Sequence, residues 1–244
     1  MIKRNYYKVV RVFPDPSSYF YIKNETMSDT IIEIGDSSWL NILNLEYSFD
    51  KVNWTVVSSS IESIPADSYV YFRNTSGTFC TSEYFGKIFL FSDVSLGGDI
   101  RTLFNYIDVD SVTAIPAYGF KNPFVHFSGK ITDISNLSFR GITSIGDYGL
   151  ESTFWQGNSS FTKGVDLRGI TTLGEGALKL MYSDNHNLTE VYAPNVSTWD
   201  MSKSQDWLSN TTPTGVVYKP STLDIPTGDS GIPYNWTTQD YPTI

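Results

Sequence analysis

The chain has 244 residues, which is enough for one or two domains with full hydrophobic cores. Charged residues make up 18% and aromatic residues 15%, a composition typical of an all-β extracellular or virion-surface protein and not of a disordered chain. The formal net charge of −9 argues against a general nucleic-acid binder, because phosphate contacts need clustered Lys and Arg. The single cysteine, Cys80, argues against a disulfide framework and a multi-cysteine zinc site, and we interpret it as a small buried hydrophobe.

Residues 1–16 have two interpretations. Val9–Phe13 forms the first strand of a domain and Pro14 closes it, or the segment is an arm that docks on another subunit. Met1–Tyr7 lacks the apolar segment of a secretory signal, and no stretch of the chain approaches the ~18–20 apolar residues that cross a bilayer. We therefore expect neither export nor membrane insertion.

The next part of the chain is predicted to be a β-sandwich domain spanning residues 17–105. Short segments rich in aromatic and β-branched residues recur there with turn residues between them, a pattern typical of an antiparallel sandwich. We expect a short helical joint at Thr102–Phe104. The predicted strands lie at 18–24, 30–35, 45–50, 54–57, 69–73 and 87–91.

An internal repeat follows. Residues 136–150 and 164–178 match in register, 28 residues apart, with Arg, Gly, Ile, Thr, Gly and Leu recurring. Such a period signals stacked units that cannot bury their apolar faces alone, so we predict a short solenoid over 106–224. A C-terminal cap is predicted over 225–244. Three weaker copies are 114–120, offset by 30 residues, and 191–196 and 217–220.

Each repeat is predicted to combine a short strand with a single helical turn. Leu137 and Phe139 alternate with polar residues and point one way from the strand. The five-residue step from Ile145 to Leu150 suits one helical turn. We expect Asp147, like its counterpart in the next repeat, to start that turn by facing exposed N–H groups.

The repeat resembles the BspA-like leucine-rich repeat. Thr143–Leu150 is a near-complete match to the consensus T-S-I-G-x-x-A-F, and Thr171–Leu178 is a good match. The resemblance implies a mainly β protein with a small curved solenoid used for adhesion or recognition. It implies no catalytic residue.

Four further segments occur in a recognisable order, namely Glu46–Trp54, Ile64–Arg73, Leu96–Leu103 and Ser230–Thr237. Together they resemble a module in proteins of gut anaerobes and their phages, in which BspA-like repeats follow the module. This second resemblance covers roughly residues 18–240. Two departures are the turn Asp50–Asn53, which lacks the family's glycine, and Asn74, which replaces a glycine after Tyr-Phe-Arg.

The chain offers little that points to catalysis. Of the two histidines, His126 lies in an apolar setting typical of a structural residue, and His186 lies in a polar loop. Glycoside hydrolysis needs paired carboxylates, but we interpret Asp147 and Glu175 as structural residues at equivalent repeat positions. We expect no enzyme activity, no metal site and no cofactor.

A binding surface is the remaining hypothesis. A polar loop holding an aromatic residue follows each predicted turn, and stacking places these loops on one side of the solenoid. Aromatic rings flanked by amides and carboxylates suit sugar rings. The alternative is that Trp155 and Trp207 fill the solenoid interior or a subunit interface. The candidate glycan-binding residues are Trp155, Gln156, Asn158, Tyr182, Asp184, Asn185, His186 and Trp207.

The two resemblances together imply a non-enzymatic virion structural protein of a tailed phage, assembled in the host cytoplasm. As a fibre, decoration or adhesion subunit it would contact other virion proteins, form a homo-oligomer and bind host cell-surface polysaccharide. Two alternatives stay open. One is a purely structural head or tail component without glycan binding, and the other is a carbohydrate-binding or adhesion module of a bacterial surface protein.

Overall fold

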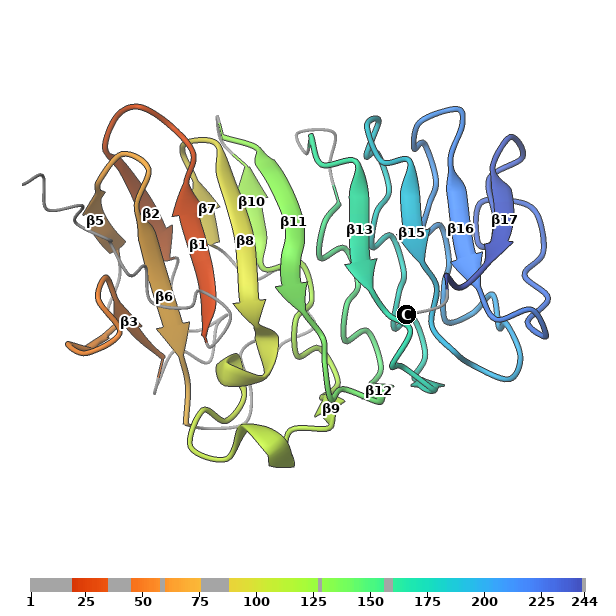
Figure 1. The fold of residues 1–244 in the computed structure, drawn as a ribbon, viewed down its shortest axis with the longest axis horizontal. Coiled ribbons are helices and arrows are strands. Elements are labelled where there is room, and N and C mark those ends of the chain that lie inside the picture. The colour runs from red at the N-terminus through yellow and green to blue at the C-terminus, as the bar shows by residue number, and fades with distance from the viewer. Residues whose placement is uncertain are drawn as a thin grey trace, which may run out of the picture.

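A computed structural model describes residues 19–34, 45–57, 60–75, 88–126, 129–155 and 160–242. Within those ranges the protein is mainly β, with four sheets and two short 3-10 helices, η2 (Ile100–Leu103) and η3 (Val109–Ser111). The molecule is elongated, with the strands of the N-terminal half at one end of its long axis and those of the C-terminal half at the other (Figure 1). The predictions for residues 1–16 and for Cys80 lie outside the described residues.

Two sheets make up the N-terminal half. The larger has the strand order β11-β8-β1-β6-β3-β4, the smaller has β10-β7-β2-β5, and in Figure 1 the smaller lies behind the larger. Alternation along the strands buries Ile22 and Phe72 from the larger sheet and Ile32 from the smaller in one core. The strands are β1 (Phe20–Asn24), β2 (Thr30–Ile34), β3 (Glu46–Ser48), β4 (Thr55–Val56), β5 (Ser60–Ile64), β6 (Tyr69–Arg73), β7 (Ile88–Leu90), β8 (Val94–Asp99), β10 (Phe124–His126) and β11 (Ile131–Ser138).

The pairing in these sheets is mixed. β1 pairs with β6 and β8, and β2 pairs with β5 and β7, all antiparallel. By contrast, β10 pairs with β7 and β11 pairs with β8 in parallel. A parallel pair needs a crossover connection, and the chain from β8 through η2 and η3 to β11 supplies it. The pairs between strands of residues 17–105 are antiparallel, and the two strands that join these sheets after residue 105 pair in parallel.

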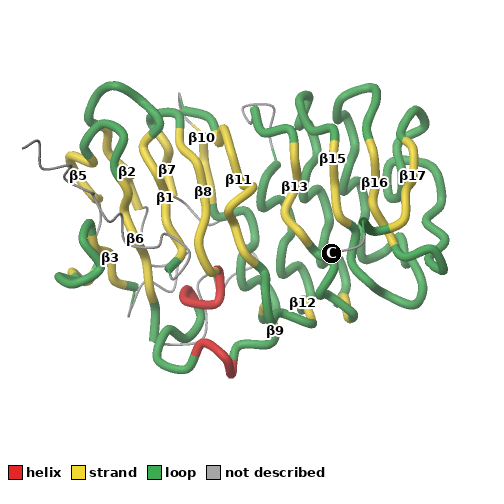
Figure 2. Tube along the Cα trace, in the orientation of Figure 1, coloured by secondary structure: helices red, strands yellow, loops and turns green. Residues whose placement is uncertain are grey.

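The repeats stack their strands in parallel, in the register that the sequence period indicates. β9 (Ala114–Ile115), β12 (Ser144–Ile145) and β14 (Thr172–Leu173) form one sheet, with Ser144 opposite both Ala114 and Thr172. A second parallel sheet runs along the front of the C-terminal half, where short strands alternate with long loops (Figure 2). Its strands are β13 (Lys163–Asp166), β15 (Glu190–Tyr192), β16 (Val216–Lys219) and β17 (Thr237–Asp240).

The predicted helical turn in each repeat is wrong. The Tyr148 and Leu150 N–H groups donate to the carbonyls of Glu175 and Ala177 in the next repeat, at 2.7 and 2.9 Å. The Gly149 N–H donates within its own turn, to Gly146. This alternation leaves no intrahelical i to i−4 bonds, and it puts Tyr148 in the left-handed region at φ 55°. Each repeat therefore contributes a ladder of turns bonded to its neighbour.

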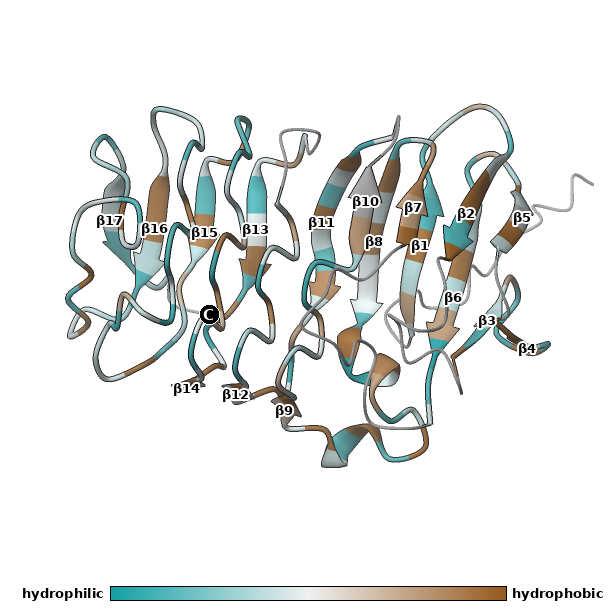
Figure 3. Cartoon of the chain, turned by 180° about the vertical axis from the view of Figure 1, so that it is seen from behind, coloured by the Kyte–Doolittle hydropathy of each residue, from teal (hydrophilic) through white to brown (hydrophobic). Residues whose placement is uncertain are grey.

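Apolar residues at equivalent repeat positions fill the interior. Leu137 and Phe139 are buried as predicted, and so are Ile145 and Leu150. The core continues from the two N-terminal sheets to Trp236 near the far end. Figure 3 shows hydrophobic residues alternating with hydrophilic ones along the strands. Within the described ranges, no helix has the length and apolar content that crossing a bilayer requires.

Candidate binding surface

Three of the eight residues predicted to bind glycan are inside the protein. Tyr182 is fully buried, its ring stacks on Phe154 with centroids 5.7 Å apart, and its hydroxyl accepts a hydrogen bond from the Val165 N–H at 2.9 Å. Trp207 is also fully buried, and its Nε1 donates to the Gly231 carbonyl at 2.6 Å. A ring without exposed surface cannot stack on a sugar. The prediction that Tyr182 and Trp207 bind glycan is therefore wrong. The burial of Trp207 agrees with the alternative that this residue fills the interior.

Asn185 is the third buried residue. Its Nδ2 donates to the carbonyls of Phe154 at 2.6 Å and Tyr182 at 3.1 Å, so the side chain ties two adjacent repeats together. Its Oδ1 has no hydrogen-bond partner among the described residues. The amide therefore stabilises backbone inside the stack and is not available to a sugar hydroxyl.

Trp155 and Asp184 come together at the surface. The half-buried Trp155 donates from Nε1 to Asp184 Oδ2 at 3.0 Å, and Asn210 donates to Asp184 Oδ1 at 3.1 Å. His186 is exposed nearby in the sequence, whereas Gln156 and Asn158 lie outside the described residues. Glycan binding by Trp155, Asp184 and His186 stays a prediction.

An aromatic surface that sequence reasoning missed covers the larger N-terminal sheet. Tyr21 lies opposite Tyr71, and Lys23 lies opposite Tyr69, so these four side chains share the face turned away from the smaller sheet. The Tyr69 and Tyr71 rings are stacked with centroids 5.9 Å apart, and the Tyr21 ring meets Tyr69 edge-on at 5.2 Å. Gly97 on β8 makes room, because a Cβ there would lie 2.2 Å from the Tyr21 hydroxyl.

Arg73 extends this surface towards the end of β6. Its guanidinium lies over the Trp54 ring at 4.0 Å and over the Tyr106 ring at 4.2 Å, which are cation–π contacts. Glu46 pairs with Arg73 at 2.5 Å, and Tyr19 packs on Trp54 with centroids 4.9 Å apart. We define the aromatic face as Tyr19, Tyr21, Trp54, Tyr69, Tyr71 and Tyr106 together with Lys23, Lys51 and Arg73.

Two buried tyrosines of the aromatic face, Tyr21 and Tyr71, favour their protonated form. Burial, reinforced by the neighbouring Tyr69 and Asp133, raises the pKa of Tyr21 to about 12. Burial also raises the pKa of Tyr71. Lys23 forms ion pairs with Glu25 at 2.9 Å and Asp67 at 2.7 Å. The face therefore offers flat rings, neutral hydroxyls and cations whose positions are fixed before a ligand arrives.

The signal for this face was present in residues 69–73. Val70 and Phe72 alternate with Tyr69, Tyr71 and Arg73, so burying the first pair leaves two rings and a guanidinium on the opposite side. An antiparallel strand with one solvated face more often carries small or charged polar residues there. Aromatic residues on both faces of one strand therefore indicate that the outward face is a binding surface for a ligand or another protein.

The carboxylate of Asp147 has a structural partner. Asp147 accepts a hydrogen bond from the Glu175 N–H at 2.8 Å, so this carboxylate supports the next repeat. No cluster of three or more metal-ligating side chains occurs in the part of the chain that the structure describes. Comparisons of the chain with protein-family models, curated proteins and solved structures found no match.

Proposed function

We propose that the protein is a non-enzymatic virion structural protein of a tailed phage that contacts host surface glycans, as a fibre, decoration or adhesion subunit. The resemblance to modules of gut anaerobes and their phages supports the virion assignment. The proposal includes an N-terminal β-sandwich followed by a short BspA-like solenoid. Parallel strands paired at 28- and 30-residue offsets support the solenoid, and the two layered N-terminal sheets support the sandwich.

The proposed glycan binding is supported by the aromatic face. Planar rings bind the C–H faces of sugars, while tyrosine hydroxyls and cations bind the sugar hydroxyls. The half-exposed rings of Trp54 and Tyr69 are the stacking positions. The buried Tyr21 and Tyr71 pack against Tyr69, and Tyr19 packs against Trp54. This assignment places a glycan-binding surface on the larger sheet, in addition to the predicted contacts of Trp155, Asp184 and His186 in the repeat loops.

Many copies on one particle would turn weak contacts into firm attachment. A single shallow site of this kind binds weakly, but linked sites raise the effective concentration and increase avidity by about 10²–10⁴. The protein therefore needs no deep pocket in this role. We expect a homo-oligomer, bound to other virion proteins.

Affinity electrophoresis in gels containing host capsular polysaccharide tests the proposal. Wild type should be retarded, whereas Trp54→Ala and Tyr69→Ala should migrate freely while retaining wild-type circular dichroism. Tyr234→Ala is the matched control, because it removes a ring that is 81% exposed outside the aromatic face.

The purely structural alternative makes the opposite prediction. If the aromatic face is a subunit interface, Trp54→Ala and Tyr69→Ala should lower the oligomeric mass, and wild type should pass through the polysaccharide gel without retardation. Mass photometry of the same preparations measures that mass. This result would leave the virion assignment and remove the glycan contact.

A further inference from the structure

Three arginines stand at equivalent places where consecutive strands of the front surface end. Arg101 follows β8, Arg140 follows β11 and Arg168 follows β13. Ser138 lies opposite Asp99 in the β11–β8 pair, and the 28-residue repeat aligns Ser138 with Asp166. The three strand ends therefore read Asp-x-Arg, Ser-x-Arg and Asp-x-Arg.

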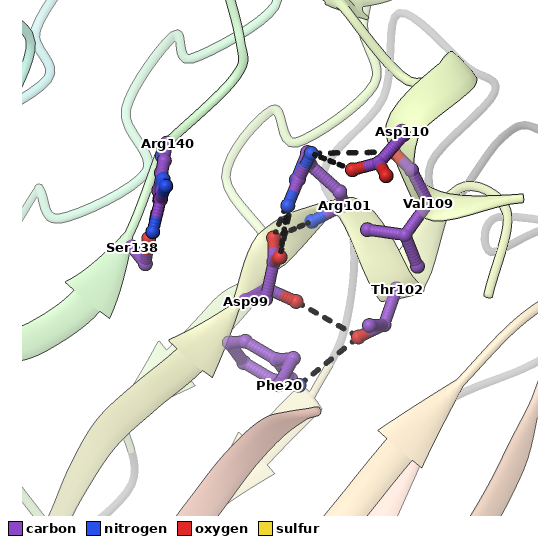
Figure 4. A network of polar contacts seen from close by, with 8 residues as sticks. All are labelled: Phe20, Asp99, Arg101, Thr102, Val109, Asp110, Ser138 and Arg140. Atoms are coloured by element: carbon purple, nitrogen blue, oxygen red, sulfur yellow. Dashed lines mark hydrogen bonds and ion pairs between the residues drawn. The ribbon is translucent and has the colours of Figure 1, made fainter. Parts of the chain in front are cut away.

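The first and third arginines are each held by the aspartate two residues before them. Arg101 Nη2 lies 2.7 Å from Asp99 Oδ2, and its Nη1 reaches Asp110 at 3.2 Å (Figure 4). Arg168 Nη2 lies 2.6 Å from Asp166 Oδ2, with its Nε 2.9 Å from Oδ1. These are the two-pronged contacts in which a guanidinium satisfies a carboxylate.

The middle arginine, Arg140, has a serine in place of the aspartate that pairs with each of the other two arginines. Among the described residues, the Ser138 hydroxyl accepts a hydrogen bond from the Arg140 backbone N–H alone, at 3.3 Å. Arg140 is exposed, and its guanidinium makes no ion pair or hydrogen bond with any residue that the structure describes. In Figure 4 no dashed line joins the Arg140 guanidinium to the Asp99–Arg101–Asp110 network beside it.

Arg140 lines a groove with a volume of about 620 Å³. Arg168, Asn195 and Tyr241 line the same groove, above a floor that includes the buried Leu137. Tyr241 is fixed by the hydrogen bond from its hydroxyl to the Ala193 carbonyl at 2.6 Å. The groove thus combines an unpaired cation, an exposed amide and an immobilised ring.

The charge inside the groove is positive although the whole chain is acidic. Among the described residues, Asp166 is the only carboxylate in the lining. Burial works to raise the pKa of Asp166, but hydrogen bonds and charge from Arg168 outweigh it and hold that pKa below its ordinary value. The charges of Arg168 and Asp166 neutralise each other, so the net positive charge of the groove comes from Arg140. The Tyr192 ring, 5.0 Å from the Arg168 guanidinium, helps to keep that pair in place.

We propose that this groove binds the carboxylate or sulfate group of an acidic saccharide, with Arg140 as its charge partner. The ligand's anion takes the place that Asp99 and Asp166 occupy beside the other two arginines. Asn195 supplies hydrogen bonds to neighbouring hydroxyls, and Tyr241 supplies an apolar contact for the sugar ring. This assignment of the saccharide class rests on the proposed glycan-binding function and places an anionic subsite apart from the aromatic face.

Ser138→Asp gives a sharp test, because it restores the Asp-x-Arg sequence and supplies Arg140 with its own carboxylate. Ser138→Asn is the matched control of equal size without charge, and Arg140→Gln removes the cation directly. Lys130→Gln controls for the loss of one exposed positive charge elsewhere. Binding to immobilised polygalacturonate, dextran sulfate and neutral dextran is measured by biolayer interferometry, and circular dichroism monitors folding.

We expect wild type, Ser138→Asn and Lys130→Gln to bind at least one acidic polymer, more weakly as salt rises. Arg140→Gln and Ser138→Asp should bind it at least about tenfold more weakly, because a charge-assisted contact is lost. Equal binding by all variants, or no acidic-polymer binding by wild type, would overturn the inference. Competition by inorganic sulfate without any polymer binding would mean a site for free anions and would overturn the saccharide assignment.

Trp54→Ala in the same experiment separates this inference from the proposed function. If Trp54→Ala loses polymer binding while Arg140→Gln and Ser138→Asp keep it, the groove assignment is wrong and the aromatic face stands. If only the groove variants lose acidic-polymer binding, the groove stands and the aromatic face is not the glycan site.

Discussion

The Trp155 indole donates a hydrogen bond to Asp184 Oδ2 at 3.0 Å, which joins the loops of two consecutive repeats. The sequence places these residues 29 positions apart and offers both as ligand contacts. In the structure each is the partner of the other, and Asn210 from the following repeat extends the chain of contacts to Asp184 Oδ1.

Replacing Asp184 should therefore lower stability. Asp184→Ala removes the side-chain hydrogen bonds from Trp155, Asn210 and Ser183 and places alanine at φ 64°, which is a left-handed conformation. We expect the free energy of unfolding to fall by about 1–3 kcal/mol. Asp184→Asn should cost less, since asparagine tolerates that conformation and keeps an acceptor. His186→Ala should stay within about 0.5 kcal/mol of wild type as a surface substitution. Urea denaturation measures all three, and an unchanged Asp184→Ala would refute the structural role.

Glu151 carries a charge ladder across three repeats. The carboxylate is buried and forms ion pairs with Lys121 at 2.7 Å and Lys179 at 3.0 Å, which occupy equivalent positions in the preceding and following repeats. Glu151→Gln should lower the free energy of unfolding by about 2–4 kcal/mol, because both lysines lose their counter-charge. A double-mutant cycle with Lys179→Met checks the coupling. Strictly additive effects would show that Glu151 and Lys179 are not coupled.

Trp207 should be a stability residue and not a binding residue. Trp207→Ala empties a fully buried site and leaves the Gly231 carbonyl without its donor, so we expect a loss of about 3–5 kcal/mol. Tyr182→Phe should cost about 1–3 kcal/mol, since the buried Val165 N–H loses its acceptor. Thermal unfolding measures both. Retained stability together with lost glycan binding would restore these residues to the binding site.

Alkaline pH should loosen the aromatic face. The pKa of Tyr21 is raised by burial to about 12, above the ordinary value near 10. A raised pKa means that the neutral form is favoured in the folded state. Its contribution to stability is therefore complete below about pH 10 and is lost as pH rises towards 12. Tyr21→Phe should unfold with a weaker pH dependence across that window in urea denaturation. If the free energy of unfolding falls equally with pH in both proteins, the pKa of Tyr21 is not raised in the folded state.

Much of the repeat region could be predicted from the sequence because its order is local and periodic. The recurrence of Arg-Gly-Ile-Thr between 140–143 and 168–171 fixed the 28-residue offset, and strand pairing follows it. The sequence period does not, however, exclude the helical turn predicted in each repeat. The spacing of Ile145 and Leu150 suits either structure, and only the neighbouring repeat decides where the amides bond.

The predicted site failed for a different physical reason. Polar residues around Tyr182 and Trp207 suggested exposed loops, but Ser183, Asn185 and Ser204 are themselves buried. Asn185 donates to backbone carbonyls and Ser204 to the Ser230 carbonyl, which satisfies the stacked turns from inside. The return of β10 and β11 to the first two sheets is equally non-local, because it depends on pairing across about 30 residues or more.

The most direct test of the account is binding of the purified oligomer to capsulated host-like cells and to the same cells stripped of capsule. Fluorescently labelled wild type and Tyr234→Ala should bind only the capsulated cells, and folded Trp54→Ala and Tyr69→Ala should bind neither. Equal binding of all four proteins to capsulated cells, or no binding by multivalently presented wild type, would contradict the proposal that the aromatic face attaches a virion protein to host glycans.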